Sequence, residues 1–306
     1  MQIDLLIEQV LNGVQFGVML FLLAAGLTLI FGVMGLINLA HGSLYMVGAF
    51  ACAAVASMTG SFWLGLAASL AAAAAAGAIV EVVVVRRLYS RGHLDQVLAT
   101  FALILVFSEG TRWLFGSSPL YLNIPSALSG AVSLPGGLDY SLYRLFIIVV
   151  GIAVAAGLYF LIAHTRLGMR IRAGESDREM IAALGVDITT LYTLVFALGA
   201  ALAGLAGAMV GALQSVQVGM GEPVLILAFV VIVIGGIGSI KGALIGAILV
   251  GVIDTLGRFL LPAALHLFLP ASQAASIGGS IASMLIYVFM ALVLVVRPRG
   301  LFSANA

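Results

Sequence analysis

Few side chains in this sequence could do chemistry, and two of its acids each have a base within reach on a helix. Glu109 and Arg112 are spaced i, i+3, and Asp254 and Arg258 are spaced i, i+4, so each pair can meet on one helix face. Such pairing would offset part of the cost of keeping a charge near lipid. The sequence has no Ser-His-Asp, HExxH or paired-carboxylate pattern. An intramembrane enzyme is therefore disfavoured, and we expect no catalytic residue, metal site or cofactor.

A second kind of candidate is a polar interruption of an apolar stretch. Residues 27–48 read LTLIFGVMGLINLAHGSLYMVG, with Asn38, His41 and Gly42 in the middle. At membrane depth, polar side chains and broken helix are tolerated only where protein buries them or where they line an aqueous cavity. Two interpretations stay open. One is a discontinuous helix at a translocation pathway, and the other is a cytoplasmic turn in which Asn38 and His41 cap helices.

A similar interruption occurs late in the chain, where residues 229–251 read FVVIVIGGIGSIKGALIGAILVG. Three glycines should break the helix there, and His41-Gly42 and Lys241-Gly242 each open a span of small residues, which hints at a duplicated half. The Walker pattern is absent, so a phosphate-binding loop is disfavoured. We assign both interruptions to a predicted translocation pathway that comprises Asn38, His41, Gly42, Gly235, Gly236, Gly238 and Ser239.

The densest island of charge runs over residues 164–188. Ser176 followed by Glu179 fits a capping box, which predicts that a helix begins there. Gly185 predicts that this helix ends near Leu184, because glycine adopts the left-handed conformation freely. A helix of roughly two turns is far too short to cross a bilayer, which needs about 20 residues. The segment could be a simple connection between spans, but the predicted caps favour an element that docks on a partner.

The composition is that of an integral membrane protein. Of 306 residues, 63% are hydrophobic and 8% are charged, with a net charge of +1, whereas a soluble domain carries about 25% charged residues. No basic cluster interleaved with aromatic residues suggests nucleic acid binding. The single cysteine, Cys52, excludes an internal disulfide.

Hydropathy predicts an all-α polytopic bundle, with one transmembrane domain over residues 1–306 and about 8–10 spans, some of them short or broken. A run at 224–234 is too short to cross as a full helix, and we expect either a half-helix there or a span continued by the glycines after it. Arginines gather at 86–91, 166–178 and 297–299, which places these three regions on the cytoplasmic side and the connection 116–142 outside. The eight long apolar runs lie at about 10–31, 42–58, 62–85, 94–115, 143–163, 189–213, 242–261 and 277–296.

Three stretches together resemble one family. Gly26 to Gly42, the charged loop Arg172 to Asp187 and Gly235 to Gly246 are similar, in order and in the spans between them, to bacterial ABC permeases of the branched-chain amino acid type. The resemblance covers nearly the whole chain. It implies an inner-membrane permease subunit of an ATP-driven importer for branched-chain amino acids or related small amino acids, amides or carboxylates. Ser43 stands where many relatives have an acidic residue, which leaves the solute open.

The resemblance also implies partners. These are a second, related permease in a heterodimer, two cytoplasmic ATP-binding subunits that hydrolyse ATP, and a periplasmic substrate-binding protein. Residues 164–188 then form the cytoplasmic coupling helix, and the residues matched to that role are Arg172, Glu175, Asp177, Glu179 and Gly185.

Two other classes compete with this interpretation. An ion-coupled secondary transporter or channel for a small solute needs an intramembrane ion site, but its nearest candidates, Glu109 and Asp254, each have an arginine available. A purely structural subunit would leave the broken helices unexplained. The importer permease is therefore the leading hypothesis.

Overall fold

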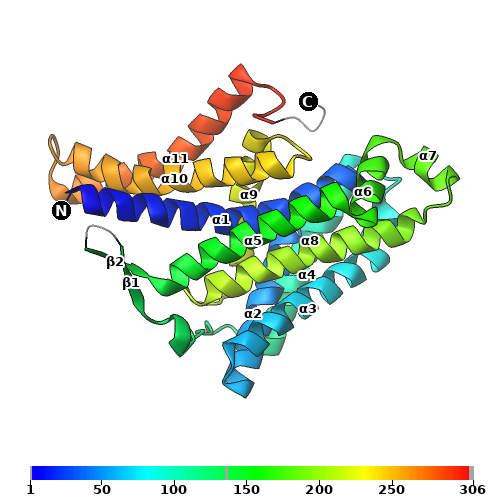
Figure 1. Ribbon diagram of the computed structural model, residues 1–306, viewed down its shortest axis with the longest axis horizontal. Helices are drawn as coiled ribbons and strands as arrows, with labels where there is room; N and C mark the ends of the chain where they lie inside the picture. The colour runs from blue at the N-terminus through cyan, green and yellow to red at the C-terminus, as the bar shows by residue number, and fades with distance from the viewer. Residues whose placement is uncertain (1, 135–136, 303–306) are drawn as a thin grey trace. The chain divides into compact units, whose positions relative to one another are not determined.

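The computed structural model describes residues 2–134 and 137–302, and in this part of the chain helices dominate (Figure 1). Eight of the helices described are long and apolar enough to cross a membrane. They confirm the eight predicted apolar runs. These helices are α1 Gln2–Met34, α2 His41–Thr59, α3 Phe62–Val83, α4 His93–Phe115, α5 Leu142–His164, α8 Ile188–Gly211, α10 Ile240–Leu265 and α11 Ala271–Val296.

The remaining elements are short. Helix α9, Gly221–Gly235, is apolar but has only 15 residues, which confirms the predicted half-helix. Two strands form an antiparallel hairpin in which Val132 faces Tyr140. The other short elements are η1 Val85–Leu88, η2 Ser126–Leu128, β1 Ala131–Leu134, β2 Leu138–Ser141, α6 Arg166–Ser176 and α7 Arg178–Ala183.

The chain folds as two compact units. One comprises Leu22–Pro125 and Ala153–Ala228, and the other comprises Met1–Phe21, Ser126–Ile152 and Phe229–Ala306. Helices α1, α5 and α9 each run from one unit into the other. That residues 1–306 work as one permease domain stays a prediction.

In the first unit, α2, α3 and α8 pack against one another. In lipid the hydrophobic effect does not drive helices together, so they associate through close packing. Small residues permit this packing because they let the helix backbones approach closely. A Cβ on Gly199 would lie 2.8 Å from the carbonyl oxygen of Gly26, and one on Gly207 would overlap the Tyr45 carbonyl. The strip of small residues along α8 is therefore its contact face toward α1 and α2.

In the second unit, α10 packs along α11 and against the start of α1. A Cβ on Gly17 would lie 2.6 Å from the carbonyl oxygen of Ala247. Asn12 accepts hydrogen bonds from Tyr140 of the hairpin (3.2 Å) and from Arg144. The N-terminal part of α1 thus lies against the hairpin and the start of α5.

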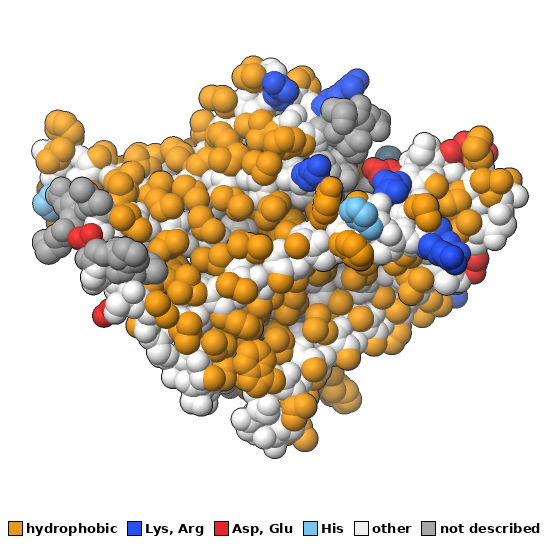
Figure 2. All heavy atoms as spheres, in the orientation of Figure 1, with side chains coloured by type: hydrophobic (Ala, Val, Ile, Leu, Met, Phe, Trp, Pro, Cys, Tyr) orange, Lys and Arg blue, Asp and Glu red, His pale blue; other side chains and the backbone are white. Residues whose placement is uncertain are grey.

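The surface fits a bilayer. Figure 2 shows hydrophobic side chains covering the long helices on the face that it presents, while charged side chains gather around α6 and α7 and near the end of α11. Charge at the helix ends and apolar side chains between them are what a membrane-spanning bundle requires.

Candidate translocation and coupling sites

The predicted interruption after α1 is confirmed. Helix α1 ends at Met34, Gly35 takes a φ of +65°, and α2 begins only at His41. Glycine tolerates this left-handed conformation because it has no Cβ. Asn38 and His41 are both 0% exposed. The break therefore holds two polar side chains in the interior of the first unit.

These side chains do not cap α2. Its N-cap is Ala40, and no described residue supplies a side-chain cap there. Asn38 Oδ1 accepts a local bond from the Ala40 amide at 3.0 Å. Among the residues that the structure describes, the amide nitrogen of Asn38 and both ring nitrogens of His41 make no hydrogen bond of normal geometry, and the backbone of Leu23 lies beside the His41 ring. The capping interpretation is thus not what the structure shows.

Unpartnered polar groups in the interior are costly. Each costs about 1–3 kcal/mol when it is buried without a hydrogen bond. Within residues 2–134 and 137–302, Thr28, Tyr45 and Tyr192 of the same unit also bury hydroxyls without a partner. Buried polar groups without a partner in a native protein usually have a functional or structural role. A pathway for a polar solute is one such reason, and this role stays a prediction.

The second predicted interruption is also confirmed. Helix α9 ends at Gly235 and α10 begins at Ile240, with Gly236 at φ +104° and Gly238 at φ +81°. The hydroxyl of Ser239 accepts from the Gly242 amide at 3.0 Å and so caps α10. This gives Ser239 a structural function whether or not it also contacts a solute.

The chain after α11 covers this second break. The amide of Leu301 donates to the Ile234 carbonyl and the amide of Phe302 donates to the Gly235 carbonyl, both at 2.9 Å. The last carbonyls of a helix have no partner within the helix. Here the C-terminal segment supplies their partners.

The capping box predicted in the charged loop is wrong. Ser176 is the last residue of α6, and Asp177 is the N-cap of α7, with Oδ1 accepting from the amides of Glu179 (3.0 Å) and Met180 (2.9 Å). A carboxylate is a stronger acceptor than a hydroxyl and is favoured by the helix dipole. The helix therefore begins one residue later than predicted, and its six residues are fewer than the predicted two turns.

The predicted end of that helix is confirmed. Its C-cap is Leu184, and Gly185 takes a φ of +85°. Met180 of α7 is 62% exposed and the C-cap residue Leu184 is 78% exposed, so two apolar side chains lie at the surface here. Partial desolvation raises the pKa of Glu175 at the end of α6, although that residue keeps an exposed surface.

Sequence reasoning missed α6 as a separate helix. Thr165 caps it by accepting from the Gly168 amide at 3.1 Å, and Arg172 donates back to the carbonyl of Ile162 in α5. The signal was present, because threonine is a favoured N-cap and Gly168 three residues on allows a tight turn. The docking segment, by which we mean residues 164–188, is therefore two capped helices rather than one.

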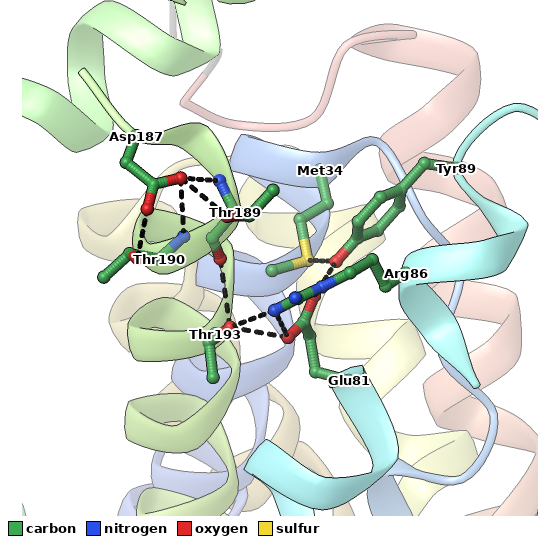
Figure 3. A network of polar contacts seen from close by, with 8 residues as sticks. All are labelled: Met34, Glu81, Arg86, Tyr89, Asp187, Thr189, Thr190 and Thr193. Carbon is green, nitrogen blue, oxygen red and sulfur yellow. Dashed lines mark hydrogen bonds and ion pairs between the residues drawn. The ribbon is translucent and has the colours of Figure 1, made fainter. Parts of the chain in front are cut away.

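Asp187 ends the docking segment and caps α8. Its carboxylate accepts from the amides of Thr189 (2.9 Å) and Thr190 (3.2 Å) and from both hydroxyls (Figure 3). The hydrogen bonds from Thr189 and Thr190 lower the pKa of Asp187 to about 2. The cap is therefore ionised at any physiological pH.

A buried acid that accepts four hydrogen bonds, Glu81, was also missed. It lies in an apolar run near the end of α3 and is 0% exposed. Arg86 donates to both carboxylate oxygens (3.2 and 2.9 Å), and Tyr89 (2.9 Å) and Thr193 (2.6 Å) donate one bond each. Burial and the bond to Glu81 raise the pKa of Tyr89. An ionisable residue within a span was the available signal.

The two ion pairs predicted from spacing are present. Arg112 donates to Glu109, and Arg258 Nε donates to both oxygens of Asp254 at 2.9 and 3.0 Å. The acids that an ion-coupled carrier would need are thus already paired. In the described part of the chain no group of three or more His, Cys, Asp or Glu side chains could hold a metal ion.

These features define a class: a multi-pass membrane protein with two interrupted helices and an exposed, capped helical segment between spans. Comparison with known proteins places it further. Residues 9–296 match the family model described as branched-chain amino acid transport system, permease component. The chain therefore belongs to this family. It is an importer permease of the inner membrane, and not an autonomous carrier or channel.

The individual relatives agree with the family match. The chain is 30% identical to the high-affinity branched-chain amino acid transport system permease protein BraD of Pseudomonas aeruginosa, over 96% of this chain and 95% of the relative. It is 28% identical to the corresponding LivH protein of Escherichia coli (96% and 94%) and 28% identical to the ribose import permease protein RbsC of Escherichia coli (76% and 72%). No solved structure is significantly similar to the chain.

Proposed function

We propose that this permease carries branched-chain amino acids, or related small amino acids, amides or carboxylates, inward in an ATP-driven system. The observation that supports this most is the full-length likeness to BraD and LivH, whose names state branched-chain amino acid transport. The shorter likeness to a ribose permease is why the solute has to be measured.

The proposed pathway uses the two interruptions. Asn38 and His41 are its polar contacts, because both are buried at a helix break and have side-chain nitrogens without a hydrogen-bond partner among the described residues. Gly42 allows the backbone of α2 to approach that of α9, since a Cβ there would lie 2.6 Å from the Gly221 carbonyl oxygen. The second interruption contributes Gly235, Gly236, Gly238 and Ser239.

The proposed partners are supported by the family match, since the family is described as the permease component of a transport system. Two cytoplasmic ATP-binding subunits hydrolyse ATP and dock on residues 164–188, where the contact residues are Arg172, Glu175, Asp177, Glu179 and Gly185. A second, related permease completes the membrane part, and a periplasmic binding protein delivers the solute. Movement of the docked segments then switches the bundle between outward and inward access.

The test of the function is uptake of labelled leucine by proteoliposomes that hold the permease with its candidate partners. We expect uptake to require ATP and the ATP-binding subunits, to stop with vanadate and to ignore an ion uncoupler. Competition by valine, other small amino acids, amides and ribose then defines the solute. Leucine uptake that persists without the ATP-binding subunits and collapses with the uncoupler would contradict the proposal.

The docking role has its own test. Glu175→Arg reverses an exposed charge on α6, so we expect it to weaken binding of the ATP-binding subunits and ATP-driven uptake together. Asp139→Arg is the matched control, because it reverses an exposed charge on the hairpin, which α5 separates from the docking segment. Equal binding and uptake for wild type and Glu175→Arg would contradict the docking role.

A further inference from the structure

The four residues Glu81, Arg86, Tyr89 and Thr193, which we term the Glu81 network, join three helical elements of the first unit (Figure 3). Glu81 belongs to α3, Arg86 to η1 and Thr193 to α8. A carboxylate in the interior is stable only while its oxygens keep their donors. Moving one of these elements away from the others would therefore leave the Glu81 carboxylate without part of its donors, which is costly.

One end of the network leads to the docking segment. Thr193 lies on the first turns of α8, and its hydroxyl is 3.0 Å from the Thr189 carbonyl oxygen. Thr189 in turn donates to Asp187, the last acid of the docking segment, at 2.6 Å. A displacement of the docking segment thus reaches Thr193 through one short stretch of helix.

The other end leads to the first interruption. The hydroxyl of Tyr89 is 2.9 Å from Glu81 and 3.8 Å from the sulfur of Met34. Met34 is the last residue of α1, directly before the break that contains Asn38 and His41. The Glu81 network is thus in contact with both regions for which a functional role is proposed.

The Thr193 hydroxyl has two possible acceptors for a single hydrogen. It accepts from Arg86 Nη2 at 2.8 Å, so it can donate either to Glu81 Oε2 at 2.6 Å or to the carbonyl of Thr189 at 3.0 Å. In the first arrangement Thr193 of α8 is bonded directly to the acid of α3, and in the second it is linked to that acid only through Arg86. Discrete alternatives of this kind are what an element needs in order to pass on a movement.

We propose that Glu81 is a positioning residue that transmits movement of the docking segment, through Thr193 and Tyr89, to the helix break after Met34. The inference rests on the proposed function, since it takes the docking segment as the place where ATP-driven movement enters. It adds a route within this chain that neither the motif match nor the relatives assign. Glu81 touches no solute in this scheme and acts through other residues.

The test measures uptake per ATP hydrolysed in the reconstituted complex. Thr193→Val removes the switching hydroxyl and keeps the shape, while Glu81→Gln removes the charge. We expect both variants to keep ATP hydrolysis and to lose about fivefold or more in uptake per ATP, the lower range for coupling between sites. A purely structural defect would reduce the amount of working complex, so uptake and hydrolysis would fall together and their ratio would stay the same.

Two matched controls separate this effect from general loss of polar groups. Thr100→Val removes a buried hydroxyl that bonds only within its own helix, to the carbonyls of Gln96 and Val97. Glu109→Gln removes the acid of an exposed i, i+3 pair. Both should keep the wild-type ratio. If Glu81→Gln does not assemble, Thr193→Val decides alone.

The outcomes distinguish a failure of this inference from a failure of the proposed function. A wild-type ratio in Thr193→Val, and in Glu81→Gln where it assembles, overturns the inference and leaves the proposed function standing. A wild-type complex without ATP-dependent uptake overturns the proposed function and this inference with it. A low ratio in the two variants, with normal ratios in the controls, supports the transmitting role.

Discussion

The two helix interruptions have similar sequences but differ in how their polar groups are satisfied. At the first, the Asn38 amide and the His41 ring have no hydrogen-bond partner among the described residues for three of their nitrogens. At the second, Ser239 caps α10 and the segment Leu301–Phe302 binds the last carbonyls of α9. A glycine-rich break can thus leave polar side chains without a partner or satisfy its polar groups within the protein, and the first break has more free hydrogen-bonding groups for a polar solute.

The largest expected effect comes from removing the free hydrogen-bonding groups at the first break. Replacing Asn38 and His41 by leucine should lower uptake per folded transporter about tenfold or more, since a site built to hydrogen-bond a solute loses its partners. The same change should leave stability within about 1–3 kcal/mol of wild type, because removal of the unpartnered groups is offset by loss of the bond from the Ala40 amide to Asn38. Uptake and thermal unfolding measured on one preparation check both parts. Normal uptake would end the pathway role of the first break.

A substitution at the second break should instead lower the stability of the protein. Gly236→Ala places a side chain at φ +104° and against the Phe302 carbonyl, and we expect a loss of about 1–3 kcal/mol. Gly110→Ala is the control, because a Cβ there meets nothing within 4 Å. Thermal unfolding in detergent compares the two variants. Equal midpoints for Gly236→Ala and Gly110→Ala would mean that the C-terminal segment does not close this break.

A smaller change separates capping from solute contact at the second break. Ser239→Ala should destabilise the protein by about 1 kcal/mol through loss of the α10 cap, and, because Ser239 belongs to the proposed pathway, it should also lower uptake per folded transporter. Ser280→Ala, which removes a hydroxyl bonded within its own helix, serves as the control. Wild-type uptake per folded transporter in Ser239→Ala would limit Ser239 to capping α10 and end its pathway role.

The docking segment allows a comparison at the level of two neighbouring residues. Asp177→Ala removes the acceptor of two amides and should cost α7 about 1 kcal/mol. Ser176→Ala should have little effect, because Ser176 ends α6 and does not cap α7. Binding of the ATP-binding subunits to each variant measures the difference. A larger loss of binding in Ser176→Ala than in Asp177→Ala would support the capping box predicted from the sequence.

The smallest effect concerns Asp187. Its pKa is lowered from 3.8 to about 2, so its contribution to stability is complete above pH 4 and is lost only as the pH falls through about 2. The difference in unfolding midpoint between wild type and Asp187→Asn should therefore be constant from pH 8 to pH 5. A difference that changed within this range would contradict the depressed pKa.

The sequence by itself determined the membrane-spanning architecture and the places where it is interrupted. Eight spans, the half-helix α9 and both breaks follow from hydropathy and glycine, which act through the residue itself and its immediate neighbours. The pairs Glu109 with Arg112 and Asp254 with Arg258 were predictable for the same reason, since spacing on one helix fixes which side chains meet.

Choices between competing partners were decided only by the tertiary structure. Asp177 caps α7 in place of Ser176, because Ser176 is still the last residue of α6. Glu81 and Thr193 lie 112 positions apart in the sequence, and the contact between Phe302 and Gly235 likewise joins distant segments. No local pattern encodes such pairings, because they depend on how close small residues let the helices approach and on which buried groups then need a donor.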